Sequence, residues 1–317
     1  MTSWRPTASR EALARRAGLL AAVRQFFQTR GVLEVETPLL SSAAVTDIHL
    51  ESFLAHPPGG TPYYLQTSPE FPMKRLLAAG SGAIYQICKV FRGGESGTRH
   101  NPEFTLLEWY RPGFDHYQLM DEVDELLNQL LGCLPAQRLS YREAFQQQAA
   151  IDPLLATGAE LRHRALTLGI GEVSLADSDR DGWLDLLLTH QVAPALGSNG
   201  HPCFLYDYPA SQAALAKIRP GDPPVAERFE VFIGGLELGN GYHELTNAEE
   251  QRQRFLADLA QRRRRGLPEP PMDETLLAAL TEGLPDCAGI AIGLDRLLMI
   301  ALGERDIGAV LAFPFRP

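Results

Sequence analysis

The strongest constraint on the fold of this 317-residue chain lies in residues 83–110. Two apolar segments, 83–91 and 103–110, have the residue types and alternation of β-strands, and the polar loop 92–102 between them contains three glycines and a proline. The loop has no helical pattern that could carry the chain back for a parallel pairing. We therefore predict two antiparallel strands joined by a long loop.

The rest of the chain alternates between helical and strand patterns. Apolar residues at helical spacing predict a first helix that begins at Thr7 or Ser9 and ends at Gly31, followed by a strand over 32–37. Most strands follow one another without βαβ spacing, so the predicted fold class is α+β, an antiparallel sheet flanked by helices in a single domain over residues 1–317. Further expected elements are helices at 117–134, 141–148, 159–168 and 183–190, a strand at 228–238, a helix from a Thr246–Glu249 capping box to Arg265, and a glycine-kinked strand turning into a helix at 289–296.

The charge of the chain limits its partners. It contains 29 Lys and Arg against 39 Asp and Glu, a formal net charge of −10, which disfavours general binding to a phosphate backbone. The apolar stretches are too short for a membrane span and the N-terminus has no apolar signal core, so we expect no membrane partner. The four cysteines form no C-x-x-C pair and favour a reduced, cytoplasmic location.

The predicted strand pair also carries residues suited to nucleotide chemistry. Arg92 ends the first strand and can bind a phosphate through two parallel hydrogen bonds, and His100 in the loop can donate to a second phosphate. Phe104 can stack on a nucleobase. It shares one face of the second strand with Glu108 and Tyr110, because residues at even spacing point the same way. These side chains predict an ATP site with a carboxylate beside it.

Four segments of the chain resemble one enzyme family. Arg92, the run His100–Thr105 and Glu108 resemble motif 2 of the class II aminoacyl-tRNA synthetases in its lysyl form. The family's antiparallel core agrees with the predicted sheet, and the resemblance implies an enzyme that activates a lysine-type amino acid with ATP. The other three segments, in the family's order, are 31–40 (motif 1), 237–245 (the lysyl-enzyme segment ahead of motif 3) and 289–296 (motif 3).

Motif 1 begins near residue 31, so we expect no N-terminal anticodon-binding domain and do not expect tRNA to be the acceptor. A lysyl-synthetase-like core of this length is similar to the elongation factor P lysyltransferases. That family activates (R)-β-lysine as an adenylate, with ATP converted to AMP and pyrophosphate, and joins it by an amide bond to a lysine side chain of translation elongation factor P. The resemblance thus implies a ligase, elongation factor P as the protein substrate, and a homodimer formed through motif 1.

Two alternatives remain open. The first is an enzyme that charges tRNA with lysine without an anticodon domain. The second is an inactive paralogue that only binds an amino acid or a partner. Intact Arg92, His100, Glu237 and Arg296 argue against the inactive form.

The expected amino-acid site follows from the charges of the substrate. A lysine-type substrate brings two ammonium groups, and buried cations need paired anions. We expect Glu108 and Tyr110 to bind the side-chain ammonium with Glu244, and Ser68 with Glu70 to bind the other amine. Ser68 stands where lysyl-tRNA synthetases usually have alanine and Ala291 where they usually have glycine, which the resemblance links to an amino group on the β carbon. The full predicted set is Ser68, Pro69, Glu70, Glu108, Tyr110, Asn240, Glu244 and Ala291.

The expected nucleotide site is built from cations. Arg92 and Arg296 are the predicted catalytic residues, with Arg92 bridging the substrate carboxylate and the α-phosphate, and with His100 and Arg296 on the outer phosphates. Gly94 replaces the glutamate that the family usually has two positions after the motif 2 arginine, so the adenine contacts are expected from Glu95 or from the backbone. The ATP set implied by the resemblance is Arg92, Gly93, Gly94, His100, Asn101, Phe104, Glu237, Leu238, Gly293 and Arg296.

Mg²⁺ is expected on Glu230 and Glu237, because it prefers oxygen ligands and usually takes one or two carboxylates with the phosphates. The two residues are seven positions apart on one predicted strand and therefore do not share a face. A bend or a bulge is needed to bring them together.

Overall fold

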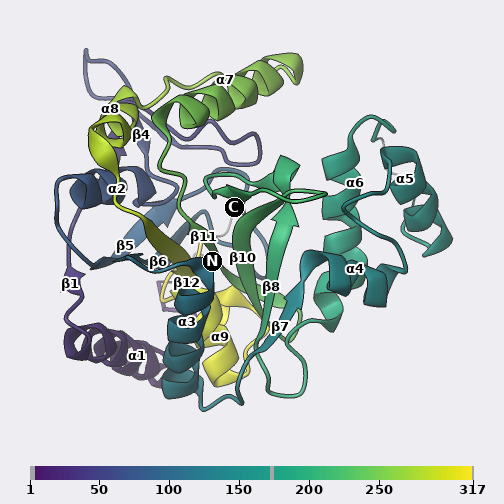
Figure 1. Ribbon diagram of the computed structural model, residues 1–317. Coiled ribbons are helices and arrows are strands. Elements are labelled where there is room, and N and C mark those ends of the chain that lie inside the picture. The colour runs from purple at the N-terminus through teal and green to yellow at the C-terminus, as the bar shows by residue number, and fades with distance from the viewer. Residues whose placement is uncertain (1–3, 172–174, 316–317) are drawn as a thin grey trace. The chain divides into compact units, whose positions relative to one another are not determined.

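A computed structural model describes residues 4–171 and 175–315 (Figure 1). The chain divides into two compact units. Unit 1 consists of Met1–Phe114 with Leu245–Pro317, and unit 2 is the continuous segment Asp115–Glu244. Each unit combines helices with a sheet that is mainly antiparallel, which confirms the predicted α+β class.

The main sheet of unit 1 has the strand order β1 (Leu33–Glu34), β5 (Ile84–Phe91), β6 (Glu103–Pro112) and β12 (Cys287–Gly293). β5 pairs antiparallel with β6 and β6 antiparallel with β12, so the predicted hairpin around the loop 92–102 is confirmed. β1 pairs parallel with β5 and is shorter than the expected strand over 32–37. β1 lies at the edge of the sheet, so only β5 forms hydrogen bonds with it. Pro38 has no backbone N–H and cannot continue this pairing.

Unit 1 also holds a small sheet of very short strands, β2 (Leu40–Ser41), β4 (Tyr63–Leu65) and β3 (Leu54–Ala55), in that order. The helices of the unit are α1 (Arg10–Thr29), α2 (Glu70–Ala78), α7 (Ala248–Arg264), α8 (Glu274–Gly283) and α9 (Leu294–Leu302), with a 3₁₀ turn at Ile307–Ala309. Ser9 caps α1, as expected for one of two candidates. Asn247 caps α7, one residue later than the expected Thr246, because its side chain reaches the N–H of Glu250.

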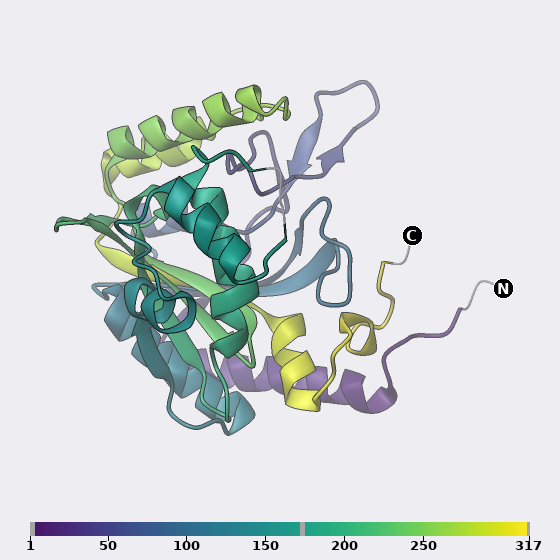
Figure 2. The same cartoon turned by 90° about the vertical axis from the view of Figure 1, so that its right-hand side faces the viewer.

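A buried carboxylate joins α9 to the rest of unit 1. Asp295 accepts a hydrogen bond of 2.7 Å from the backbone N–H of Thr105 on β6 and forms an ion pair with Arg16 on α1. Arg16 also donates to the carbonyl of Val310. Figure 2 shows the yellow C-terminal segment beside the purple start of α1, where the hydroxyl of Thr7 donates to the carbonyl of Leu311.

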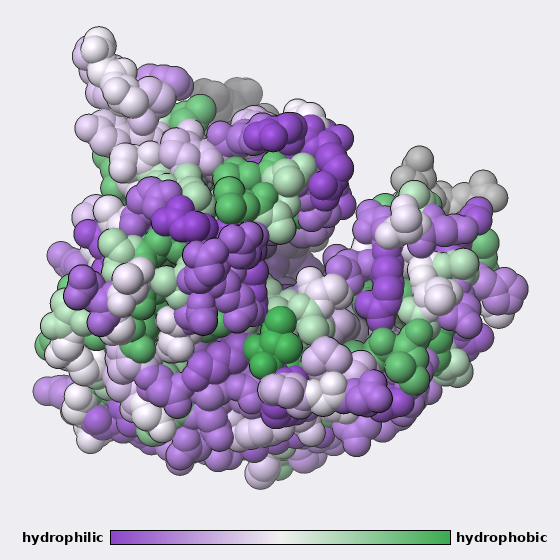
Figure 3. Space-filling view, turned by 45° about the horizontal axis from the view of Figure 1, so that its top comes forward, coloured by the Kyte–Doolittle hydropathy of each residue, from purple (hydrophilic) through white to green (hydrophobic). Residues whose placement is uncertain are grey.

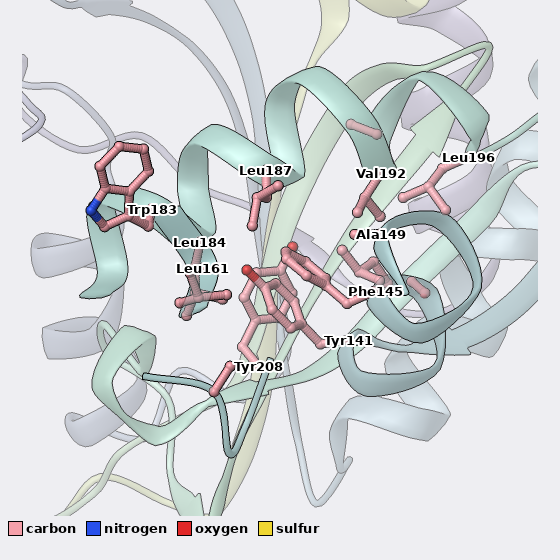
Figure 4. Packing of buried hydrophobic residues seen from close by; sticks show 14 of the residues in the cluster. Tyr141, Phe145, Ala149, Leu161, Trp183, Leu184, Leu187, Val192, Leu196 and Tyr208 are labelled. Carbon is pink, nitrogen blue, oxygen red and sulfur yellow. The ribbon is translucent and has the colours of Figure 1, made fainter. Parts of the chain in front are cut away.

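Unit 2 is built on the strand order β11 (Leu236–His243), β10 (Val225–Ile233), β8 (Cys203–Pro209) and β7 (Gln137–Ser140), with β9 (Ile218–Arg219) paired to β10. Aromatic residues form its core, in which the rings of Tyr141 and Phe145 stack at 4.4 Å and Tyr208 packs against Tyr141 (Figure 4). The helical segments are α3 (His116–Leu131), α4 (Tyr141–Ala149), α5 (Gly158–Thr167), α6 (Arg180–Leu187), a π-helical turn at Leu188–Val192, and 3₁₀ turns at Ala193–Ala195 and Ala210–Gln212.

The expected single strand over 228–238 is wrong. The chain turns back at Gly234 and Gly235, and β10 and β11 form an antiparallel hairpin. Both glycines have positive φ, 58° and 72°, which two-residue hairpin turns require and which the apolar run did not reveal. A register shift follows Val231, so that Glu230 lies opposite Asn240 while Phe232 lies opposite Glu237.

The surface carries hydrophilic residues over most of the face shown in Figure 3, and hydrophobic residues are visible there in small groups. Among the described residues, none of the helices combines the length and the apolar composition needed to cross a lipid bilayer.

We predict that Gly197 is required for the β10–β11 turn. Its carbonyl accepts from the N–H of Gly234, its φ is +69°, and a Cβ there would lie 2.3 Å from the carbonyl oxygen of Phe232. Gly197→Ala is expected to lower the free energy of unfolding by about 2–4 kcal/mol, measured by urea denaturation. Gly200→Ala is the control, because Gly200 also has positive φ but open space around it, and should cost only about 1 kcal/mol. Equal losses in the two variants would contradict the steric argument.

Candidate active site

The first predicted phosphate ligand, Arg92, lies directly after β5 and beside the predicted stacking aromatic. Its guanidinium carbon is 5.1 Å from the centre of the Phe104 ring, and its Nε donates to the carbonyl of Thr67 at 3.3 Å. Glu95 lies 3.7 Å from the guanidinium. A cation held next to a half-buried aromatic ring can contact the phosphates of a nucleotide whose base stacks there.

The second predicted pair, His100 and Arg296, is in contact. An NH₂ group of Arg296 lies 2.7 Å from Nε2 of His100, although the two residues are 196 positions apart. A guanidinium only donates, so Nε2 accepts and the ring proton resides on Nδ1. Partial burial and then the guanidinium of Arg296 lower the pKa of His100, and Arg92 and Arg99 act in the same direction. The His100 ring is therefore neutral beside these cations. Its protonated Nδ1 can still donate a hydrogen bond to an anionic ligand.

The glycines and Asn101 shape the loop around these cations. The N–H of Gly93 donates to the carbonyl of Glu51 at 2.8 Å, and a Cβ at Gly93 would lie 3.0 Å from the Glu51 side chain. Gly94 has φ of +74°. Asn101 is buried and binds backbone groups on both sides, donating to the carbonyl of Glu103 and accepting from the N–H of Phe315.

The predicted ammonium site of unit 1 is a buried cluster around Glu108. Ser68 donates to one carboxylate oxygen of Glu108 at 2.8 Å and Tyr110 to the other at 2.7 Å. On the neighbouring strand β12, Ala291 lies directly opposite Glu108. Ser68 is held in turn by the N–H of Glu70, which donates to its hydroxyl at the start of α2. The sheet and α2 thus bring five predicted substrate residues together, with Pro69 as the residue before α2.

Burial changes the acidity of this cluster. Desolvation, followed by repulsion from Glu70, raises the pKa of Glu108 from 4.5 to about 8, against the lowering effects of the Tyr110 and Ser68 hydrogen bonds and of Lys74. The carboxyl therefore holds a proton at neutral pH until a cation enters. A substrate ammonium would supply that cation and favour the carboxylate.

Lys74 was not predicted as a site residue. It is 1% exposed and its Nζ lies 2.7 Å from Oε1 of Glu70, one helical turn earlier on α2. The spacing of four residues on a helix was the available signal, because such pairs face each other. Lys74 fixes the Glu70 carboxylate, so Glu70 and Glu108 have different electrostatic environments.

The predicted nucleotide residue Gly293 lies at the junction of β12 and α9, where it is the residue before the helix and pairs with Leu106 on β6. The predicted strand-to-helix change in this segment is confirmed. The junction places Arg296 on the first turn of α9, next to the buried Asp295.

The remaining predicted residues belong to unit 2 and lie on or directly after its hairpin. Glu230 lies opposite Asn240, and the hairpin brings Glu230 close enough to Glu237 for repulsion between their carboxylates. The predicted metal ligands are therefore brought together by a hairpin turn between two strands, and not by a bend within one strand. Leu238 is buried on β11, and Glu244 is buried at the residue that follows β11.

Arg228 organises these groups and was also missed. Its guanidinium donates to Glu230 at 2.7 Å and to the side-chain oxygen of Asn240 at 3.2 Å, and it lies over the ring of Tyr208. Burial opposes its charge, but Glu230 raises the pKa of Arg228 overall. The side chains of Arg228 and Glu230 are two residues apart on one strand and so face the same way, which was the signal in the sequence.

The hairpin offers the donor set that Mg²⁺ prefers. Burial and then repulsion from Glu237 raise the pKa of Glu230, with Arg228 only partly compensating. Two carboxylates that repel each other gain from a shared divalent cation, and their oxygens suit a hard ion. Glu230 and Glu237 fit the predicted metal role.

Comparison with known proteins identifies the family of the chain. The family model for class II tRNA synthetases (D, K and N) matches residues 1–317, and the chain belongs to this family. Individual relatives give a more specific comparison than the family model does. The chain is 53% identical over 317 residues to the elongation factor P–(R)-β-lysine ligase of Pectobacterium carotovorum, covering 98% of this chain and 97% of that protein. It is 54% identical over 319 residues to the protein of the same name from Vibrio cholerae, with 99% and 98% covered.

We predict that Glu108 makes the free energy of unfolding fall as pH rises. Between pH 4.5 and about 8 the folded carboxyl keeps a proton that the unfolded chain has lost, so the folded state binds more protons. Stability is then highest at the acidic end of this range. Glu108→Gln, which cannot ionise, should show a flatter decline, measured by urea unfolding at pH 5, 6.5 and 8.

The matched control is Glu282→Gln, which changes an exposed glutamate of α8. It should keep the wild-type dependence on pH. A Glu108→Gln protein with the same slope as the wild type would show that Glu108 titrates normally.

Proposed function

We propose that this chain is an ATP-dependent ligase that activates (R)-β-lysine and transfers it to a lysine side chain of elongation factor P. The observation that carries the proposal is the buried Glu108, held by Ser68 and Tyr110 and facing Ala291, on the strand that also bears Phe104. The relatives that match over nearly the whole chain bear the name of this activity.

The buried cluster around Glu108 suits a substrate with two amines. Glu108 accepts two hydrogen bonds and is almost fully buried, so an ammonium beside it would be paired in a place of low dielectric constant. Glu70 supplies a second carboxylate, whose charge Lys74 already balances in part. The methyl group of Ala291 and the hydroxyl of Ser68 narrow the pocket relative to glycine and alanine, and we assign the preference for a β-amino group to these two positions.

The first step forms the aminoacyl-adenylate. A carboxylate oxygen of the amino acid attacks the α-phosphorus of ATP, the bond to the β-phosphate oxygen breaks, and pyrophosphate leaves. Two anions must approach each other, so the protein's main task is to place cations around them. Arg92 lies beside Phe104 and is assigned to the α-phosphate, while Arg296 and His100 form a contacting pair for the outer phosphates.

The second step forms the amide. The neutral ε-amine of the acceptor lysine attacks the adenylate carbonyl, AMP leaves, and the amine loses a proton. A free lysine has a pKa of about 10.4, so the amine must lose its first proton before attack. We assign no side chain as the base, and the phosphate of the departing AMP can take up a proton.

Three further assignments accompany this reaction. Glu230 and Glu237 would hold Mg²⁺, which would neutralise charge on the phosphates. The chain is assigned to a homodimer formed through residues 31–40. We assign the enzyme to the cytoplasm, because its proposed protein substrate is a translation factor.

The decisive experiment offers the purified enzyme both acceptors. With ATP and labelled (R)-β-lysine, label is expected on elongation factor P and not on tRNA, because the net charge of −10 disfavours a polyanion. Pyrophosphate exchange should be stimulated more by (R)-β-lysine than by α-lysine. Label found only on tRNA would overturn the acceptor, and an equal or reversed preference would overturn the pocket assignment.

Ala291→Gly tests the pocket within the same assays. Removing the methyl opposite Glu108 should narrow the preference for (R)-β-lysine over α-lysine by about tenfold, the range expected for one methyl group in a closed site. Ala288→Gly is the control, because Ala288 is buried on the same strand but pairs with Arg111. An unchanged ratio in Ala291→Gly would remove Ala291 from the assignment.

We predict that charge alone cannot replace Arg92. Arg92→Lys keeps a cation but loses the planar pair of donors, so kcat/KM for pyrophosphate exchange should fall by at least about 100-fold. Arg75→Lys, on the exposed side of α2, should retain wild-type exchange. Urea unfolding of both variants separates a catalytic loss from a folding defect. A fall of less than about threefold in Arg92→Lys would contradict its role at the α-phosphate.

A further inference from the structure

A second polar cluster of unit 2 takes no part in the proposed reaction. His116 is the first residue of α3, Glu227 lies on β10 and His243 ends β11. One potential ligand atom from each lies within 4.8 Å of the other two. Nδ1 of His243 and Oε2 of Glu227 are 2.6 Å apart. We propose that these three side chains form a binding site for a divalent transition-metal ion of the zinc type.

The unsatisfied ring nitrogens of His116 are a second indication of a bound ligand. The side chain of His116 is 1% exposed, and within residues 4–171 and 175–315 neither ring nitrogen has a hydrogen-bond partner. Its Nε2 lies 3.8 Å from Oδ1 of Asp207, an atom that is likewise buried without such a partner. Buried polar atoms in native proteins are nearly always satisfied, and an ion bound at this cluster would satisfy His116 and offer a partner to Asp207.

Local structure holds His116 in this place. Asp115 caps α3, and its side chain and that of Gln118 form a reciprocal capping box that fixes the first turn. α3 packs against β10 and β11, the strands that carry Glu227 and His243. An ion bound by all three residues would therefore join the start of α3 to the sheet of unit 2.

The donor set selects the class of ion. Two imidazoles and a carboxylate suit zinc and similar ions, whereas Mg²⁺ and Ca²⁺ prefer oxygen ligands throughout. Tetrahedral zinc bonds of about 2.0–2.2 Å place ligand atoms about 3.4 Å apart. Nδ1 of His243 and Oε2 of Glu227, now 2.6 Å apart, would have to separate, while all three ligand atoms must lie closer than the present limit of 4.8 Å. Asp207, close to His116, is available as a fourth ligand.

Two neighbouring cations set the conditions for binding. Nζ of Lys217 lies 3.2 Å from Nε2 of His243, and Arg219 pairs with both Asp207 and Glu227. Without metal, Nε2 of His243 accepts from Lys217 and Nδ1 donates to Glu227. Metal binding at Nδ1 moves the ring proton to Nε2, and Lys217 must then turn away. Lys217 therefore competes with the ion.

The test uses the full chain freed of metal by a chelator. Zn²⁺ is titrated in competition with a chromogenic chelator, and Co²⁺ absorption reports the coordination. The wild type should bind one ion that His116→Leu and His243→Asn weaken at least tenfold, with loss of the Co²⁺ absorption bands. His190→Ala, which removes an exposed imidazole of the same unit, should bind as the wild type.

Lys217→Met should bind Zn²⁺ more tightly than the wild type, because the competing ammonium is gone. If His116→Leu does not fold, His243→Asn and Lys217→Met decide the question. Binding that is unaffected by the cluster variants, or no binding by the wild type, would overturn the proposal. So would a Lys217→Met protein that binds no more tightly than the wild type.

Discussion

The buried carboxylate of Asp295 holds together the parts of unit 1 on which the proposed nucleotide chemistry depends. It accepts from the N–H of Thr105 and pairs with Arg16, with its side chain 2% exposed. Thr105 follows Phe104, the proposed stacking residue, and Asp295 precedes Arg296, a proposed phosphate ligand. The bond therefore sets the spacing between an aromatic surface and a guanidinium. Charged hydrogen bonds in buried places are strong, and loss of either partner would leave an uncompensated charge.

The same arrangement, a carboxyl group held by neighbouring polar side chains, recurs at the other acidic residues assigned to the proposed reaction. Hydroxyl groups of Ser68 and Tyr110 hold Glu108, Lys74 holds Glu70, and Arg228 holds Glu230. Each carboxyl group is thus oriented by side chains of its own unit before any ligand arrives. Preorganised polar groups need little rearrangement during a reaction, which is the main way in which enzymes stabilise developing charge.

Features with local signals were predictable, whereas features set by distant contacts were not. The hairpin around 92–102, the shared face of Glu108 and Tyr110 and the start of α9 all follow from short patterns. The turn at Gly234–Gly235 is an exception: the Gly-Gly pair is a local hairpin signal, and it was missed because the apolar residues on both sides favour one continuous strand. β2, β3 and β4 are too short to show alternation. The spacing of Lys74 and Arg228 from their partners was visible, but the sequence does not show burial, and burial makes these pairs important.

Glu108 and Ala291 are neighbours in the sheet but lie far apart in the sequence, which has a consequence during translation of the chain. All of unit 2, followed by α7 and α8, emerges from the ribosome before β12 does. A nascent polypeptide consequently lacks Ala291, which lies opposite Glu108 in the proposed amino-acid site, and it lacks Arg296 as well. With the proposed roles of Ala291 and Arg296, adenylate formation would begin only once translation of the chain is nearly complete, and an unfinished molecule would neither consume nucleotide nor release a reactive acyl group.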